Sequence, residues 1–252
     1  MSAHVALWCG TGVVEVDPSL AHMALPRVQI PAFSAGPGLH RLLRVDRVAG
    51  LEGQLVEGPL GRCTVRLDGD VLQVDVGEGP FLGELALRLA YYLATSRLGG
   101  LLIHSSALAL GEVGLIACGQ SGAGKSTLAR LGRGAGARLL TDEVVQVFPD
   151  GRMGGTPFRS DPDNVGSPGL VTARYLVALR KADHEALAPL PPLEAAALVM
   201  AQCFEVEGLA IPRAEVQRRA LAFLGAVELR ALHFRKHPDA GRFIAEALAP
   251  RG

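Results

Sequence analysis

The fold of this chain is decided by two adjoining segments, Val113-Gly-Leu-Ile-Ala-Cys118 and, directly after it, Gly119-Gln-Ser-Gly-Ala-Gly-Lys-Ser126. The first segment is a short apolar run that predicts a buried strand, and the residues after the second predict the start of a helix. The second segment, which we call the 119–126 loop, matches G-x-x-x-x-G-K-[ST] at every position. Strand, glycine-rich loop and helix in this order predict an α/β fold.

The residue types of the 119–126 loop suit the binding of a phosphate chain. Glycines let the backbone bend so that its N–H groups point inward, and the helix that follows adds its positive end. Lys125 offers a cation to the β- and γ-phosphates, and Ser126 offers a hydroxyl to Mg²⁺. We therefore predict a site for a nucleoside triphosphate with Mg²⁺, taken as ATP although the loop leaves ATP and GTP undistinguished, with these cofactor-binding residues: Gly119, Gln120, Ser121, Gly122, Ala123, Gly124, Lys125, Ser126 and Thr127.

Two adjacent acids, Asp142 and Glu143, lie in an apolar run that predicts a strand over residues 138–148. A buried carboxylate costs several kcal/mol unless a cation or hydrogen bonds compensate, and a phosphate-bound metal ion is one such cation. Neighbouring residues of a strand point to opposite faces, so the two acids are not expected to do the same job. His104 ends another predicted strand; a single histidine at such a place is more often structural than catalytic.

The patterns divide the chain into a β-rich N-terminal region (residues 1–80) and a core with C-terminal helices (residues 81–252). The clearest N-terminal element is a hairpin of residues 62–67 and 70–76 around Asp68-Gly69, with Leu72 and Val74 facing a core. Leucines at helical spacing predict a helix over 81–98. The remaining patterns predict strands at 101–104, 107–110 and 227–234, helices at 125–131, 193–204, 214–224 and 239–248, with Asp239 as the cap of the last, and a long loop at 154–169.

Composition limits the possible partners. The chain has 252 residues, 49% of them hydrophobic and 20% charged, which is typical of a folded protein. Its formal net charge is zero, so charge gives no support for a nucleic acid or membrane partner. Four dispersed cysteines argue against a structural zinc site and a disulfide scaffold. No signal peptide or apolar span is visible, and we expect a cytoplasmic protein.

From about residue 102 to residue 158 the chain resembles the HPr kinase/phosphorylase superfamily, especially its shorter relatives such as the kinases of lasso-peptide gene clusters. The shared features are His104, the 119–126 loop, the pair Asp142-Glu143 and the segment Gly155-Thr156-Pro157-Phe158. His104 precedes the loop by the spacing expected of that family. The resemblance implies a P-loop core of the PEP carboxykinase/HPr kinase-like type.

The resemblance also implies roles. Asp142 would deprotonate the acceptor hydroxyl, Glu143 would hold Mg²⁺ together with Ser126, and His104 would lie by the γ-phosphate. Asp142, His104 and Lys125 are therefore the predicted catalytic residues. The family has Asp-Asp where this chain has Asp-Glu, so the division of base and metal ligand between the two acids stays open. The long signature of phosphorolysis is not found, which leaves kinase activity alone as the expectation.

The leading interpretation is an ATP-dependent kinase that phosphorylates a hydroxyl, on a serine for instance, of a peptide or small protein, as the shorter relatives do in peptide natural-product biosynthesis. A small-metabolite kinase is the alternative among enzymes, and a nucleotide-regulated binding module without catalysis is the alternative outside them. Arg152, Arg159 and the 154–169 loop are candidates to contact the acceptor, or are ordinary solvated residues. An exposed sheet edge in the N-terminal region would allow a homo-oligomer.

Overall fold

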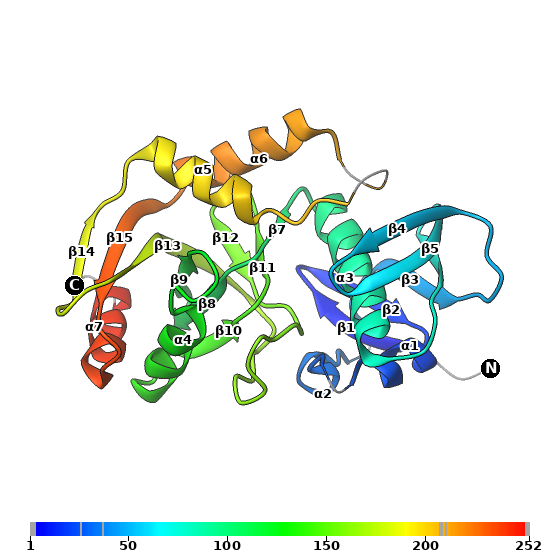
Figure 1. Cartoon of the computed structure of the whole chain (residues 1–252), viewed down its shortest axis with the longest axis horizontal. Helices are drawn as coiled ribbons and strands as arrows, with labels where there is room; N and C mark the ends of the chain where they lie inside the picture. Colours follow the sequence, from blue (N-terminus) through cyan, green and yellow to red (C-terminus); the bar gives the residue numbers. More distant parts are fainter. Residues whose placement is uncertain (1–3, 26, 37, 207–208, 210, 250–252) are drawn as a thin grey trace. The chain divides into compact units, whose positions relative to one another are not determined.

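The computed structural model describes residues 4–25, 27–36, 38–206, 209 and 211–249, and the chain divides into two compact units (Figure 1). The first unit consists of Met1–Leu98 with Glu205–Ile211, and the second of Gly99–Phe204 with Pro212–Gly252. Both units mix helices and strands, so the chain is α/β. The sequence patterns set the boundary at residue 80, whereas the helix that follows belongs to the first unit, because it packs on that unit's sheet.

The first unit is built on a six-stranded sheet with strand order β1-β2-β3-β6-β5-β4. The pairs β2–β3 and β3–β6 are parallel and the others antiparallel, so the sheet is mixed. Two short helices lie in the stretch that the sequence patterns described as strands only. The elements are β1 Val5–Cys9, β2 Gly12–Val16, α1 Pro18–Ala24, α2 Ile30–Phe33, β3 Arg41–Arg47, β4 Gln54–Gly58, β5 Gly61–Asp68, β6 Val71–Asp75 and α3 Pro80–Arg97.

The predicted hairpin is confirmed as β5 and β6, but the predicted turn at Asp68-Gly69 is wrong by one residue. Leu67 pairs with Leu72 and Asp68 with Val71, so the tight turn falls on Gly69-Asp70, with Gly69 at φ 57°. Only glycine adopts this left-handed conformation without strain. Leu72 and Val74 are fully buried, as the alternation of apolar and polar residues predicts.

Helix α3 matches the predicted helix and is buried along most of its length. It begins with a proline in its first turn and is followed by Gly99 at φ 80°, which ends it. Glu84 on this helix is only 1% exposed, and its carboxylate receives hydrogen bonds from Arg27 and Arg88. This buried charge cluster connects α3 to the segment after α1.

The second unit is built on a nine-stranded mixed sheet with the order β10-β8-β9-β13-β12-β11-β7, and with β15 and β14 continuing from β13. Strand β13 pairs in parallel with both β9 and β15, while the other pairs are antiparallel. The elements are β7 Leu101–Ile103, β8 Ser106–Leu110, β9 Val113–Cys118, α4 Lys125–Gly134, β10 Arg138–Thr141, β11 Val145–Val147, β12 Arg152–Gly154, β13 Leu170–Lys181, β14 Ala186–Pro189, α5 Pro192–Gln202, α6 Arg213–Gly225, β15 Glu228–Phe234 and α7 Pro238–Leu248.

Helices cover this sheet on both faces (Figure 1). Helices α4 and α7 pack together over one face, where Leu128 and Ile244 join Leu115, Val177 and Leu232 in the core. Helices α5 and α6 pack on each other and lie on the opposite side of the sheet. The amino end of α4 thus meets the carboxyl end of the buried strand β9.

Three predicted features of this unit need correction. The strand expected over 138–148 is two strands, β10 and β11, which pair with different partners and are separated by residues 142–144. Strands β12, β13 and β14 were not predicted. His237, rather than Asp239, caps α7, since its ring nitrogen accepts from the backbone N–H of Asp239.

No helix among the described residues has the length and apolar character needed to cross a membrane.

Candidate functional site

The 119–126 loop joins β9 to α4 and is shaped by glycines. Gly122 has φ 77° and Gly124 has φ 107°, conformations that residues with a Cβ atom rarely adopt. Lys125 begins α4 and is 8% exposed, because its side chain folds back over the loop. Its Nζ donates a hydrogen bond of 2.8 Å to the carbonyl oxygen of Gly119. A hydrogen bond from Lys125 to the first residue of the loop therefore closes the loop.

The strand end beneath the loop is apolar and closely packed. Cys118 is fully buried, and its Sγ lies 3.1 Å from the hydroxyl of Ser105. Burial raises the pKa of the Cys118 thiol to about 11, with the Ser105 hydroxyl and the Lys125 ammonium acting in the other direction. The thiol thus stays protonated at neutral pH and packs as a small apolar side chain.

The two acids lie between strands rather than inside one. Strand β10 ends at Thr141, and its hydroxyl accepts hydrogen bonds from the backbone N–H groups of Glu143 and Val144, at 3.3 and 3.4 Å. The chain turns here because β10 pairs with β8, whereas β11 pairs with β7 and β12. This turn separates the two carboxylates into different surroundings.

Asp142 is 1% exposed, and its carboxylate binds the middle of the loop that follows β12, residues 155–169. Oδ1 accepts from the backbone N–H of Ser160 at 3.0 Å. Oδ2 accepts from the Ser160 hydroxyl at 2.9 Å, the Asp161 N–H at 3.1 Å and the Asn164 amide at 2.9 Å. A carboxylate has about four lone-pair positions, so these four hydrogen bonds fill most of its capacity. Asp142 thus holds the loop in place and has little room for another partner.

Glu143 faces different groups. Its Oε1 lies 3.6 Å from Nδ1 of His104, and its side chain is 17% exposed while that of the histidine is 44% exposed. Burial lowers the pKa of Lys125, and the nearby Glu143 carboxylate acts in the opposite direction, so the two groups interact electrostatically. Glu143, His104 and Lys125 therefore form one partly exposed group beside the 119–126 loop.

Backbone hydrogen bonds fix the position of His104. It follows β7, and its N–H donates to the carbonyl oxygen of Gln202 at 2.8 Å. The next residue, Ser105, donates its N–H to the carbonyl oxygen of Glu143 at 3.1 Å. The chain on either side of the histidine is thus bound to α5 and to the acid segment, which fixes the distance between His104 and Glu143.

Ser160 was not a predicted site residue, although it lies on the 154–169 loop that was predicted as a candidate acceptor contact. Its Oγ lies 3.0 Å from Oγ of Ser126 and so connects the 119–126 loop to Asp142. The only sequence signal is a short polar run, Ser160-Asp-Pro-Asp-Asn164, which resembles many surface turns. The connection depends on a contact between residues 34 positions apart, which no local pattern reveals.

The residues around Ser126 suit a hard cation. Ser126 Oγ lies next to Ser160 Oγ, whose other partner is a carboxylate oxygen of Asp142, and Mg²⁺ prefers oxygen ligands. Within the described parts of the chain, no three His, Cys, Asp or Glu side chains come together as a complete set of ligands. Since Mg²⁺ in proteins commonly takes one or two protein ligands and the rest from phosphates and water, this donor set fits a cation that arrives with a nucleotide.

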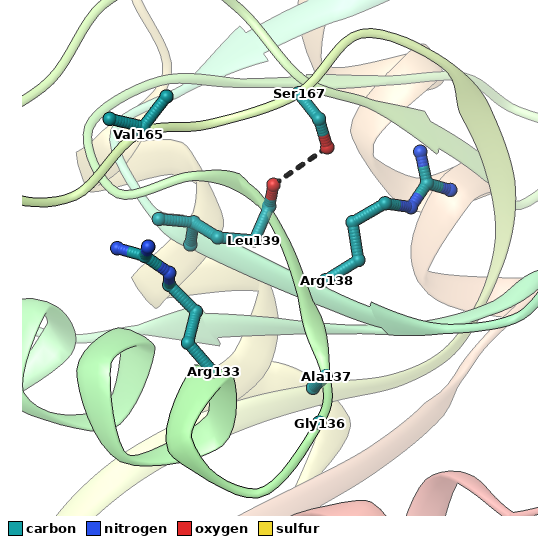
Figure 2. Close-up of a pocket in the computed structure, with 7 residues that line it drawn as sticks. All are labelled: Arg133, Gly136, Ala137, Arg138, Leu139, Val165 and Ser167. Carbon is teal, nitrogen blue, oxygen red and sulfur yellow. Dashed lines mark hydrogen bonds between the residues drawn. The ribbon is translucent and has the colours of Figure 1, made fainter.

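A separate pocket of about 320 Å³ lies at the far end of α4 (Figure 2). Ser167 closes one side by donating a 2.8 Å hydrogen bond to the carbonyl oxygen of Leu139. Two arginines flank it, and each donates to a backbone carbonyl oxygen of the 155–169 loop. The lining residues are Arg133, Gly136, Ala137, Arg138, Leu139, Val165 and Ser167, of which Val165 and Ser167 belong to the 154–169 loop suggested as an acceptor contact.

The two arginines suggested as acceptor contacts have local partners. Arg152 pairs with Asp150 at 2.7 Å and lies over the ring of Phe148. Arg159 donates to the carbonyl oxygen of Pro162 at 2.9 Å. Only Arg159 is next to the group around Ser160 in the chain, so it is the better candidate to meet a bound acceptor.

Comparisons with known proteins add no family assignment. No profile of a known protein family matches this chain, and no curated protein sequence matches it significantly. Function must therefore be argued from the side chains that meet at the amino end of α4.

Proposed function

We propose that the second unit is a P-loop core of the HPr kinase-like type that binds ATP with Mg²⁺ and transfers the γ-phosphate to a hydroxyl of a peptide or small protein. The observation that carries this proposal is the meeting of Lys125 and Ser126 with the acids of the 142–143 turn. Glu143 interacts with Lys125, and Asp142 reaches Ser126 through Ser160. A phosphate-chain cradle and acids for cation and proton chemistry are the two parts that phosphoryl transfer needs.

The 119–126 loop would bind the triphosphate. Its backbone N–H groups and the start of α4 favour negative charge, and the Lys125 ammonium, now bonded to Gly119, would turn to the β- and γ-phosphates. Ser126 would hold the Mg²⁺ ion, which when bound neutralises charge that develops on the phosphates. The buried position of Lys125 supports this role, because a cation of low exposure interacts more strongly with a bound anion.

The surroundings of the acids favour Glu143 as the general base. A base must come within hydrogen-bond reach of the acceptor hydroxyl, and the Asp142 oxygens already accept four hydrogen bonds. Glu143 is partly exposed and lies beside Lys125, where the γ-phosphate would be. His104 at 3.6 Å would orient the Glu143 carboxylate. Asp142 would then act by holding the loop that carries Ser160.

The choice of a peptide or protein acceptor rests on the resemblance of residues 102–158 to peptide-tailoring and HPr kinases. The 155–169 loop supports it in a limited way: the loop begins at the site, is anchored on Asp142, and carries Arg159 next to Ser160. A long loop without helix or strand inside a compact unit is often a binding loop.

The test is incubation of the whole protein with γ-labelled ATP, Mg²⁺ and serine-containing peptides, with Glu143→Gln and Ser167→Ala in parallel. We expect acid-stable label on a peptide hydroxyl with wild type and Ser167→Ala, and loss of label with Glu143→Gln. Label on a small metabolite, and not on a peptide, would mean that the acceptor is a metabolite hydroxyl. ATP binding without transfer to any acceptor, equal in all three proteins, would overturn the kinase and leave a nucleotide-regulated binding module.

A further inference from the structure

Ser160 has a hydroxyl that touches both halves of the site. Its Oγ is 3.0 Å from Ser126 Oγ and 2.9 Å from Asp142 Oδ2. Asp142 receives N–H donors on both of its oxygens and acts here as an acceptor, so the Ser160 hydroxyl directs its proton to Asp142. The lone pairs of Ser160 Oγ are then turned toward Ser126, the residue predicted to hold Mg²⁺.

The spacing of the two hydroxyl oxygens suits a shared cation. Mg²⁺ binds oxygen at about 2.0–2.1 Å in an octahedron, which sets adjacent ligand oxygens roughly 3 Å apart. Ser126 Oγ and Ser160 Oγ have this separation already. A cation bound to both oxygens would therefore replace their hydrogen bond without a large movement of either residue.

Asp142 supports such a role for Ser160 in two ways. Asp142 accepts hydrogen bonds from the backbone N–H groups of Ser160 and Asp161, which fixes the backbone at this point. The position of the Ser160 hydroxyl therefore does not depend only on the hydrogen bond that the hydroxyl itself donates to Asp142. A hydroxyl that donates to a carboxylate is also a better oxygen ligand, because the acceptor draws the proton and leaves more electron density on the oxygen. Carboxylates in this outer position commonly orient and strengthen metal ligands.

We propose that Ser160 is a second hydroxyl ligand, beside Ser126, for the Mg²⁺ ion that accompanies ATP, and that Asp142 orients it. This inference rests on the proposed nucleotide site and adds to it a residue outside the 119–126 loop. Ser160 is exposed, so an ion can reach it from solvent. This role makes the middle of the 155–169 loop part of the cation site, and it gives the buried Asp142 carboxylate a reason to hold that loop.

The experiment measures ATP binding by calorimetry as a function of free Mg²⁺ for wild type, Ser160→Ala, Ser160→Thr and Ser167→Ala. Ser160→Ala should raise the Mg²⁺ concentration for half-maximal ATP binding by about tenfold or more, since removal of even an outer partner of a metal ligand lowers metal affinity by about that much. Ser160→Thr keeps a hydroxyl and should restore most of the affinity. Ser167→Ala removes a hydroxyl from the same loop, away from Ser126, and should match wild type.

A cysteine variant tests direct contact. Ser160→Cys should bind ATP poorly with Mg²⁺ and recover with Cd²⁺, which prefers sulfur, while wild type shows no such preference. An unchanged Mg²⁺ requirement in Ser160→Ala, with no recovery of Ser160→Cys in Cd²⁺, would overturn the role of Ser160 and leave the proposed function intact. Wild-type protein that binds no ATP at any Mg²⁺ concentration would overturn both.

Discussion

Glu143 Oε1 lies 3.6 Å from Nδ1 of His104, on the side of the acid turn that faces Lys125. Its neighbour Asp142 is buried and bound to the 155–169 loop. The two adjacent acids therefore have different surroundings, and under the proposed function Glu143 would act on the bound phosphates' side while Asp142 holds the protein loop. Each task predicts a different response to removal of the charge.

Glu143→Gln should lower phosphoryl transfer by roughly 10²- to 10⁴-fold, the usual contribution of a general base. Its stability should change by less than about 0.5 kcal/mol, because the side chain is at the surface of the site. Asp142→Asn should lose about 1–3 kcal/mol of stability, since the new amide turns an NH₂ group toward buried donors. Denaturant titrations together with transfer assays measure both quantities. An Asp142→Asn protein as stable as wild type, combined with full transfer in Glu143→Gln, would contradict this division.

Two glycines of the 119–126 loop should respond differently to alanine. At Gly122 a Cβ atom meets nothing within 4 Å, so only the positive φ is strained, at about 1–2 kcal/mol. At Gly124 a Cβ atom would lie 2.8 Å from Cζ of Phe234, which adds overpacking of about 1–3 kcal/mol. Gly124→Ala should thus be the less stable variant in urea unfolding. Equal loss of stability in both variants would contradict this, because it would mean that the Phe234 ring moves away from the new Cβ atom with no loss of folding free energy.

As the pH rises, the affinity for ATP should begin to fall at a lower pH than it would if Lys125 had the pKa of an exposed lysine. Burial lowers the pKa of Lys125 below its usual 10.5, with Glu143 acting in the opposite direction, so the ammonium loses its proton at a lower pH than an exposed lysine. Bound phosphates favour the charged form, and binding therefore takes up protons in this range. Glu143→Gln removes the carboxylate that raises the pKa of Lys125, so the loss of ATP affinity should occur at a still lower pH in this variant. Calorimetry between pH 7 and 10 in two buffers of different ionisation enthalpy measures the affinity and the proton uptake. Affinity that stays constant to pH 10 in both proteins would contradict the role of Lys125.

The cluster of Glu84, Arg27 and Arg88 in the first unit should contribute to the stability of the protein and not to ATP binding or phosphoryl transfer. Glu84→Ala would leave Arg27 and Arg88 without their shared carboxylate, and breaking a buried pair costs about 3–5 kcal/mol. Glu78→Ala is the matched control, because Glu78 is 81% exposed in its pair with Arg47 and should cost under about 1 kcal/mol. Thermal unfolding compares the two variants. Similar midpoints for both would show that the cluster contributes no net stability.

Local patterns predicted the elements that depend on neighbours in the chain. The 119–126 loop with its flanking strand and helix, the β5–β6 hairpin and α3 carry their signals within a few residues. Strand β13 was missed because its two halves show different patterns: residues 171–175 alternate between buried and more exposed positions, whereas residues 175–179 form a continuous buried run. Neither half by itself has the length of the whole strand.

The missed parts of the site depend on contacts between distant segments. The break at residues 142–144 arises because β10 and β11 pair with different strands, which an apolar run cannot show. The contact of Ser160 with Ser126 joins residues 34 positions apart. For the same reason, sequence alone left the two acids undistinguished, and their different surroundings separate their proposed roles.

The most direct test of the central claim is the affinity of the whole protein for ATP with Mg²⁺, measured by calorimetry on wild type and Lys125→Ala. The account predicts saturable binding to wild type that needs Mg²⁺ and is lost in Lys125→Ala, with unchanged far-UV circular dichroism in both. Equal ATP binding by the two proteins, or none by the folded wild type, would contradict a nucleotide site at the 119–126 loop.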